Sequence, residues 1–112
     1  LIYTVDCGTL SFEAIKYAKD MEIDVIVLDH HQSEITLPRA HSIINPNRLD
    51  DKSNLQYLCA AGVAFMFLVS LNRELRNKKW FNTNKRMIDI FSKFHFQRHT
   101  NTCCCSQRFI VP

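Results

Sequence analysis

Two short apolar runs dominate the first thirty residues, and a segment with helical period separates them. Ile2–Val5 and Ile23–Leu28 are nearly continuous hydrophobic segments with the length of buried strands. The apolar positions between them recur every three residues and are Phe12, Ile15, Ala18 and Met21. This spacing predicts a helix with one apolar face, capped by Thr9 or Ser11. A helical crossover between two such strands implies a parallel pair with a right-handed connection, so residues 1–31 are predicted to form a β-α-β unit.

Downstream of this unit the pattern changes to polar loop and then to a long apolar helix. Residues 32–54 contain two prolines and a polar run, with Ser42–Ile44 as a third short strand. A strongly apolar helix is predicted from about residue 55 to 75, with Phe65 and Phe67 in the core. Glycine inside a helix costs roughly 1 kcal/mol against alanine, so the glycine at position 62 predicts close packing against a neighbour. The fold class is therefore α/β, a partial parallel sheet flanked by helices.

Composition narrows the class of protein without identifying it. The chain has 112 residues, 46% of them hydrophobic and 22% charged, which is typical of one small globular domain. There is no apolar run of membrane-spanning length and no signal segment, so a cytoplasmic location is the default expectation. The net charge of +3 neither requires nor excludes a nucleic-acid partner.

Five cysteines do not form a disulfide framework in this sequence. Cys7 and Cys59 stand alone in apolar surroundings, which predicts buried thiols. The three consecutive cysteines at 103–105 are poorly spaced for zinc, whose paired ligands are usually separated by about 2–4 residues.

The candidate chemistry lies at the ends of the two predicted strands. Asp6 follows the first strand, and Asp29, His30 and His31 follow the second. The carboxyl ends of parallel strands meet at one edge of the sheet, where α/β proteins bind their ligands. Carboxylate and imidazole groups suit a hard or borderline divalent metal, so the sequence predicts a metal site shared between the two strand ends.

Each of these residues also has a more ordinary interpretation. An aspartate at a strand end more often caps a turn or a helix. A histidine beside an aspartate is commonly a surface hydrogen-bond pair. His41, His95 and His99 have no matched partner in the sequence and are interpreted as structural or solvated.

Four segments together resemble the DHH phosphoesterase superfamily, and within it the RecJ-type single-strand-specific exonucleases. These segments are Thr4-Val5-Asp6-Cys7-Gly8, Val27-Leu28-Asp29-His30-His31, Ile44-Asn45-Pro46 and Leu58-Cys59-Ala60-Ala61-Gly62-Val63-Ala64-Phe65. The resemblance covers residues 1–91, which would correspond to the middle portion of a DHH domain. A bare Asp-His-His triplet is weak evidence, but its place at a strand end between the other segments makes the resemblance specific.

The resemblance implies a two-metal phosphodiesterase that uses Mn²⁺ or Mg²⁺ and metal-activated water. By motif, Asp6 would bridge both cations and His30 would ligate one of them. His31 would approach the scissile phosphate, and Asp29 would orient the histidine pair from behind. The implied function is degradation of single-stranded DNA from the 5′ end in repair and recombination, with single-stranded DNA as partner.

The chain also departs from the family pattern. The resemblance leads us to expect an Asp-x-Asp strand before residue 1 and an acidic Leu-Asp-Leu-Val-Ala-Leu-Gly-Thr-like helix soon after residue 91, and Asp89 is no convincing substitute for its ligand. Residues 92–112 instead form an irregular tail, which we interpret as out-of-frame translation, with an authentic but divergent tail as the alternative. Because the chain opens without methionine inside a predicted strand, a fragment is expected.

The expectation for function follows from that departure. A fragment with part of a dinuclear site is predicted to be inactive, or nearly so, on its own. Two alternatives stay open, namely a DHH-type phosphodiesterase of short oligonucleotides or cyclic dinucleotides, and a non-catalytic nucleic-acid-binding fragment. The sequence makes no prediction of oligomeric state.

Overall fold

The computed structural model describes residues 1–80, and within them five elements follow one another. These are β1 (Ile2–Val5), α1 (Phe12–Asp20), β2 (Val25–Leu28), β3 (Ser42–Ile44) and α2 (Ala60–Asn77). The three strands form one parallel sheet in the order β1-β2-β3. The predicted β-α-β unit, the short third strand and the α/β class are therefore confirmed.

The register of the strands decides what meets at the carboxyl edge. Val5 pairs with Leu28, and Leu28 pairs with Ile44, so all three strands end in one row. The backbone pairing continues for one further residue, because the Asp6 N–H donates to the Leu28 carbonyl and the Asp29 N–H donates to the Ile44 carbonyl, each at 3.0 Å. The first residues beyond the strands are thus held side by side.

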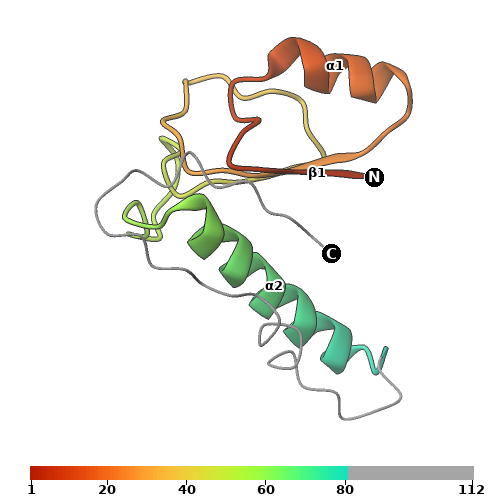
Figure 1. The fold of residues 1–112 in the computed structure, drawn as a ribbon, viewed down its shortest axis with the longest axis vertical. Coiled ribbons are helices and arrows are strands. Elements are labelled where there is room, and N and C mark those ends of the chain that lie inside the picture. The colour runs from red at the N-terminus through yellow and green to blue at the C-terminus, as the bar shows by residue number, and fades with distance from the viewer. Residues whose placement is uncertain (81–112) are drawn as a thin grey trace, which may run out of the picture. The chain divides into compact units, whose positions relative to one another are not determined.

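The core lies between α1 and the sheet. Ile15 and Ala18 of α1 cluster with Val25 and Val27 of β2, and Val27 is completely inaccessible to solvent. Figure 1 shows α1 lying along one face of the strands. Met21, predicted on the same apolar face, is 54% exposed because α1 ends at Asp20 and Met21 is its C-terminal cap.

The central strand and the first edge strand of the sheet differ in burial. β2 is central and almost fully buried, as its continuous hydrophobic sequence predicts. β1 has an equally apolar sequence, but it is an edge strand and three of its four residues are exposed. The prediction of buried cysteines was wrong for Cys7, which is exposed just beyond β1, while Cys59 is half-buried.

The long apolar helix begins later than predicted. Residues 55–59 form turns, with the Leu58 N–H donating to the Leu55 carbonyl at 2.9 Å, and α2 starts only at Ala60. A Cβ added at Gly62 would lie 3.1 Å from the side chain of Leu58, which stands four residues earlier, so the close approach at this glycine is local to the start of α2. The core assignment was wrong for Phe65, which is 48% exposed. Leu1–Phe65 form one compact unit, which ends within α2.

Several sequence predictions lie outside the described residues. They concern Asp89, the tail at 92–112 with its cysteine triplet, and His95 and His99. Their structural interpretation stays a prediction.

Candidate metal centre

The backbone at the end of β1 turns sharply to present the Asp6 side chain. Asp6 has a φ of 65°, in the left-handed region that aspartate tolerates better than most residues. Gly8 follows with a φ of 115°, which side chains rarely adopt. A Cβ at Gly8 would lie 2.6 Å from Thr4 Oγ1 and 3.0 Å from a Val27 methyl group, so the turn needs glycine for space as well as for conformation.

Asp6 and His30 meet at the edge of the sheet. Asp6 Oδ1 and His30 Nε2 lie 3.1 Å apart, and the two side chains are 31% and 19% exposed. The two atoms are thus within ion-pair distance; both are shielded from solvent, and neither makes a hydrogen bond of acceptable geometry among the described residues. Two adjacent ligands of an octahedral Mg²⁺ ion, each about 2.1 Å from it, are about 3.0 Å apart. The separation of these two unsatisfied atoms therefore fits a shared cation.

Asp29 lies behind the histidines as a buried hydrogen-bond acceptor. Asp29 is only 1% exposed, and its Oδ2 accepts a hydrogen bond from the Thr9 backbone N–H at 3.0 Å. Its Oδ1 accepts the backbone N–H groups of His30 at 2.8 Å and of His31 at 3.3 Å. The carboxylate thus organises the turn that carries both imidazoles.

The same contacts keep Asp29 ionised. Burial by itself would raise the pKa of this carboxyl, but hydrogen bonds from the Thr9 hydroxyl and backbone, from His31 and from the His30 backbone outweigh it and lower the pKa to about 2. An ionised carboxylate only accepts hydrogen bonds. His31 Nδ1 lies 2.6 Å from Asp29 Oδ1 and must therefore carry the proton of this hydrogen bond. The ring nitrogen that the bond leaves available for another partner is Nε2.

Three side chains offer donor atoms to one point. Asp6, His30 and His31 each supply a ligand atom, and these atoms lie within 4.8 Å of one another. The two imidazole rings are tilted against each other with centroids 4.7 Å apart. The predicted set is thus brought together, with Asp29 in the layer beneath. One carboxylate and two imidazoles make a mixed O/N set that suits Mn²⁺ or Mg²⁺ for the oxygen ligand and Mn²⁺ for the nitrogens.

A match to a family model shows which family the chain belongs to. Residues 1–91 match the model of the DHH family, N-terminal domain. The chain belongs to the DHH family. This match confirms the resemblance drawn from the sequence motifs.

Curated relatives of this DHH chain carry the name single-stranded-DNA-specific exonuclease RecJ. The chain is 45% identical to the protein of Salmonella typhimurium and 43% to that of Escherichia coli, each over 82 residues. It is 36% identical to the Bacillus subtilis protein over 75 residues. The matches cover 73%, 73% and 67% of this chain but only 14%, 14% and 10% of the relatives, so the chain spans about one seventh of their length or less. No solved structure matches the chain.

Three polar residues that the sequence did not single out as site residues bind the segment carrying the candidate ligands. Thr9 does not cap α1; it is buried against Asp29, while Ser11 is the helix N-cap by position without a side-chain bond. Asn45 Nδ2 donates to Thr9 Oγ1 at 2.9 Å and to the His31 carbonyl at 2.8 Å. Asn47 Nδ2 donates to the His30 carbonyl. The Asn45-Pro46 pair was the signal that could have found them, because it follows β3 directly.

The low pKa of Asp29 predicts a pH-dependent stability. Because the pKa of about 2 lies below the unfolded value of about 3.9, the stabilisation is complete above pH 4 and is lost as the pH falls toward 2. At about 1.4 kcal/mol per pKa unit, the effect is about 2–3 kcal/mol. Urea unfolding of the wild type and of Asp29→Asn at pH 6 and pH 2.5 is expected to show a steeper loss for the wild type. Parallel losses would contradict this assignment.

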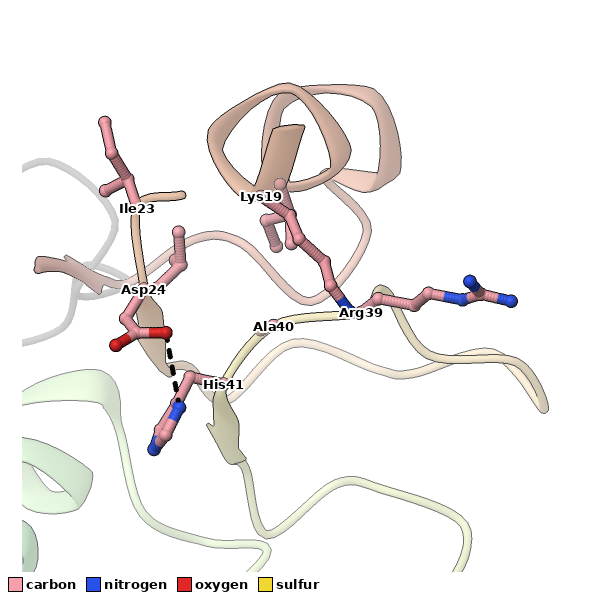
Figure 2. Close-up of a pocket in the computed structure, with 8 residues that line it drawn as sticks. Lys19, Ile23, Asp24, Arg39, Ala40 and His41 are labelled. Atoms are coloured by element: carbon pink, nitrogen blue, oxygen red, sulfur yellow. Dashed lines mark ion pairs between the residues drawn. The ribbon is translucent and has the colours of Figure 1, made fainter. Parts of the chain in front are cut away.

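A separate small cavity lies at the opposite edge of the sheet from the DHH triplet. It has a volume of about 130 Å³ and is lined by the start of β2, the end of α1 and the segment before β3. Asp24 and His41 form an exposed ion pair there at 3.4 Å, while the Arg39 guanidinium points away from that pair (Figure 2). His41 is thus solvated, as predicted, and far in the fold from the candidate metal ligands.

Within residues 1–80, no helix is long and apolar enough to cross a bilayer.

Proposed function

We propose that this chain forms the central part of the metal centre of a DHH-family hydrolase that degrades single-stranded DNA. The observation that carries the proposal is the pair formed by Asp6 Oδ1 and His30 Nε2, which lie 3.1 Å apart, shielded from solvent and without hydrogen-bond partners in the described part of the chain. Unsatisfied buried polar atoms are costly, and a shared cation would satisfy both at once.

The roles of the residues are those that the family resemblance implies, and the positions of their atoms support them. Asp6, with two carboxylate oxygens at the edge of the sheet, would bridge the two cations, and His30 would ligate one of them. His31 is the more exposed imidazole, with 47% of its side chain accessible, and its Nδ1 proton is held by Asp29. Its Nε2 would therefore meet the scissile phosphate, while Asp29 orients both rings without touching substrate.

Mn²⁺ or Mg²⁺ would supply Lewis acidity, which lowers the pKa of water and offsets charge on the phosphoryl oxygens. The chain's own residues hold that chemistry in place. Asp6 and His30 would fix the position of the metal, and the buried carboxylate of Asp29 orients the His31 ring through its contact with Nδ1 at 2.6 Å.

The described residues supply fewer donors than two cations need. Within residues 1–80, three side chains offer a ligand atom at this site. Three ligands would leave most of the coordination positions of two hard cations to water. We therefore expect the 112-residue polypeptide, by itself, to bind Mn²⁺ weakly and to show little or no nuclease activity. The substrate class rests on the names of the curated relatives, which specify single-stranded DNA.

A chimera tests this proposal directly. The 82 aligned residues of this chain would replace their counterparts in the Salmonella typhimurium RecJ protein. We expect Mn²⁺-dependent release of nucleotides from a 5′-labelled single strand by the chimera, and none above background from the isolated chain. A folded but inactive chimera, or robust activity of the isolated chain abolished by His30→Ala, would contradict the account.

The same assay separates the alternative functions. A small-molecule phosphodiesterase would turn over a dinucleotide faster than a long single strand. A non-catalytic binding fragment would bind DNA in a salt-sensitive way that Asp6→Ala leaves unchanged. The proposal predicts preference for the long strand and dependence on Asp6.

A further inference from the structure

The segment after β3 binds the backbone of the two histidines through asparagine side chains and not through its own backbone. The last ladder bond between β2 and β3 is the one from the Asp29 N–H to the Ile44 carbonyl. Beyond it, the carbonyls of His30 and His31 accept from the side-chain amides of Asn47 and Asn45. Pro46, between these two asparagines, has no N–H to donate. The asparagine side chains thus bind the His30 and His31 carbonyls on either side of a position, Pro46, that has no backbone donor.

Asn47 is itself held on both sides. Its N–H donates to Asn45 Oδ1 at 2.8 Å, and its carbonyl accepts from Ser33 Oγ at 3.4 Å. Its Nδ2 then donates to the carbonyl of His30, the residue whose Nε2 faces Asp6. A fixed donor therefore acts on the backbone of one metal-ligand candidate.

We propose that Asn47 is a positioning residue, which holds the His30 backbone so that Nε2 faces Asp6 Oδ1 at ligand spacing. The inference rests on the proposed metal centre. Asn45 supports the same turn from beneath, since it is buried and binds Thr9, which in turn binds Asp29. Asn47 is the more informative residue to change, because it is only half-buried and its side-chain amide reaches His30 rather than the core.

The test compares variants of the full 112-residue chain. Asn47→Ala removes the donor, and Asn47→Gln keeps the amide on a side chain one methylene longer. Gln56→Ala removes an exposed amide elsewhere in the same compact unit and serves as the matched control. Mn²⁺ affinity is measured by electron paramagnetic resonance of the free ion, and the His30 ring is followed in the metal-free chain by long-range ¹H–¹⁵N spectra of the imidazoles.

We expect Asn47→Ala to weaken Mn²⁺ binding by about tenfold, the lower end of the effect of losing a partner that orients a metal ligand. Asn47→Gln should lie between Asn47→Ala and the wild type, and Gln56→Ala should match the wild type. In the metal-free Asn47→Ala chain, the His30 ring signals should shift or broaden while the amide signals of β1 and α1 stay in place.

Two results would overturn the positioning role. One is an Asn47→Ala chain with wild-type Mn²⁺ affinity and unchanged His30 ring signals. The other is a loss of amide dispersion throughout the chain in both Asn47 variants, which would make Asn47 a purely structural residue. If the wild type shows no Mn²⁺ binding that depends on His30, the proposed metal centre fails, and the ring signals of the metal-free variants alone decide the positioning role.

Discussion

Replacing His30 by alanine is expected to lower the exonuclease activity of the chimera by more than about 100-fold, because even partners that only orient metal ligands contribute about 10–100-fold. His30 Nε2 is one of the two shielded, unsatisfied atoms at the site, and no neighbouring donor among the described residues can replace it at 3.1 Å from Asp6 Oδ1. The measurement is the rate of nucleotide release from single-stranded DNA at saturating Mn²⁺, together with the unfolding midpoint.

The matched control for this change is His41→Ala. His41 also pairs with an aspartate, Asp24, but both side chains are more than half exposed and lie at the opposite edge of the sheet. The control should retain full activity. Equal losses in the two variants would remove the special role of His30, and an unchanged rate for His30→Ala would contradict the proposed metal centre.

Replacing Gly8 by alanine is expected to cost several kcal/mol of folding free energy. The φ of 115° is strained for any side chain, at roughly 1–3 kcal/mol. The added Cβ would also meet Thr4 Oγ1 at 2.6 Å and Val27 methyl groups at 3.0 and 3.1 Å, an overpacking worth a further 1–3 kcal/mol or so. Small domains are stable by only about 5–15 kcal/mol, so the variant should lose a large part of its stability. Urea unfolding followed by circular dichroism measures the loss.

Gly62→Ala provides the comparison for a glycine in regular structure. Gly62 lies inside α2, where alanine gains roughly 1 kcal/mol of helix propensity. Its Cβ would approach the end of the flexible Leu58 side chain at 3.1 Å, which can move by a few tenths of an ångström. We expect a net change within about 1 kcal/mol. A Gly8→Ala chain as stable as Gly62→Ala would show that the turn after β1 can relax.

The arrangement of the site could be predicted from sequence because strand ends are strongly determined. Two apolar runs joined by a helix have to form a right-handed parallel crossover, and this places Asp6 and His30 at one edge before any coordinates are known. The observed register, Val5 opposite Leu28, brings the following residues into the same row. The metal-binding roles of these residues stay predictions.

The polar network beneath the site could not be predicted in the same way. Thr9 or Ser11 was expected to cap α1, because a hydroxyl before a helix usually does so, but the Thr9 hydroxyl binds the buried Asp29 carboxylate. Asn45 and Asn47 act from a loop, where no hydrophobic period indicates which side chain turns inward. Their partners are backbone carbonyls, which a sequence does not distinguish from one another.

Errors at the boundaries have a common physical cause. Leu55 and Leu58 continue the apolar spacing of α2 toward its N-terminus, but a turn closed by the Leu58 N–H comes before the helix. Met21 continues the spacing of α1 beyond its C-terminal end. Periodicity records which side chains are apolar, whereas helix ends are set by backbone hydrogen bonds that the pattern does not contain.

The most direct measurement of the central claim is anomalous diffraction from crystals of the chain, or of the chimera, grown with Mn²⁺. The account predicts an anomalous peak about 2.1–2.3 Å from both Asp6 Oδ1 and His30 Nε2, a typical bond length for a hard divalent cation with oxygen or nitrogen ligands. It further predicts that Asp29 lies outside the coordination sphere. A Mn²⁺ peak elsewhere, or none at this edge of the sheet while Asp6 and His30 stay in place, would contradict the metal centre.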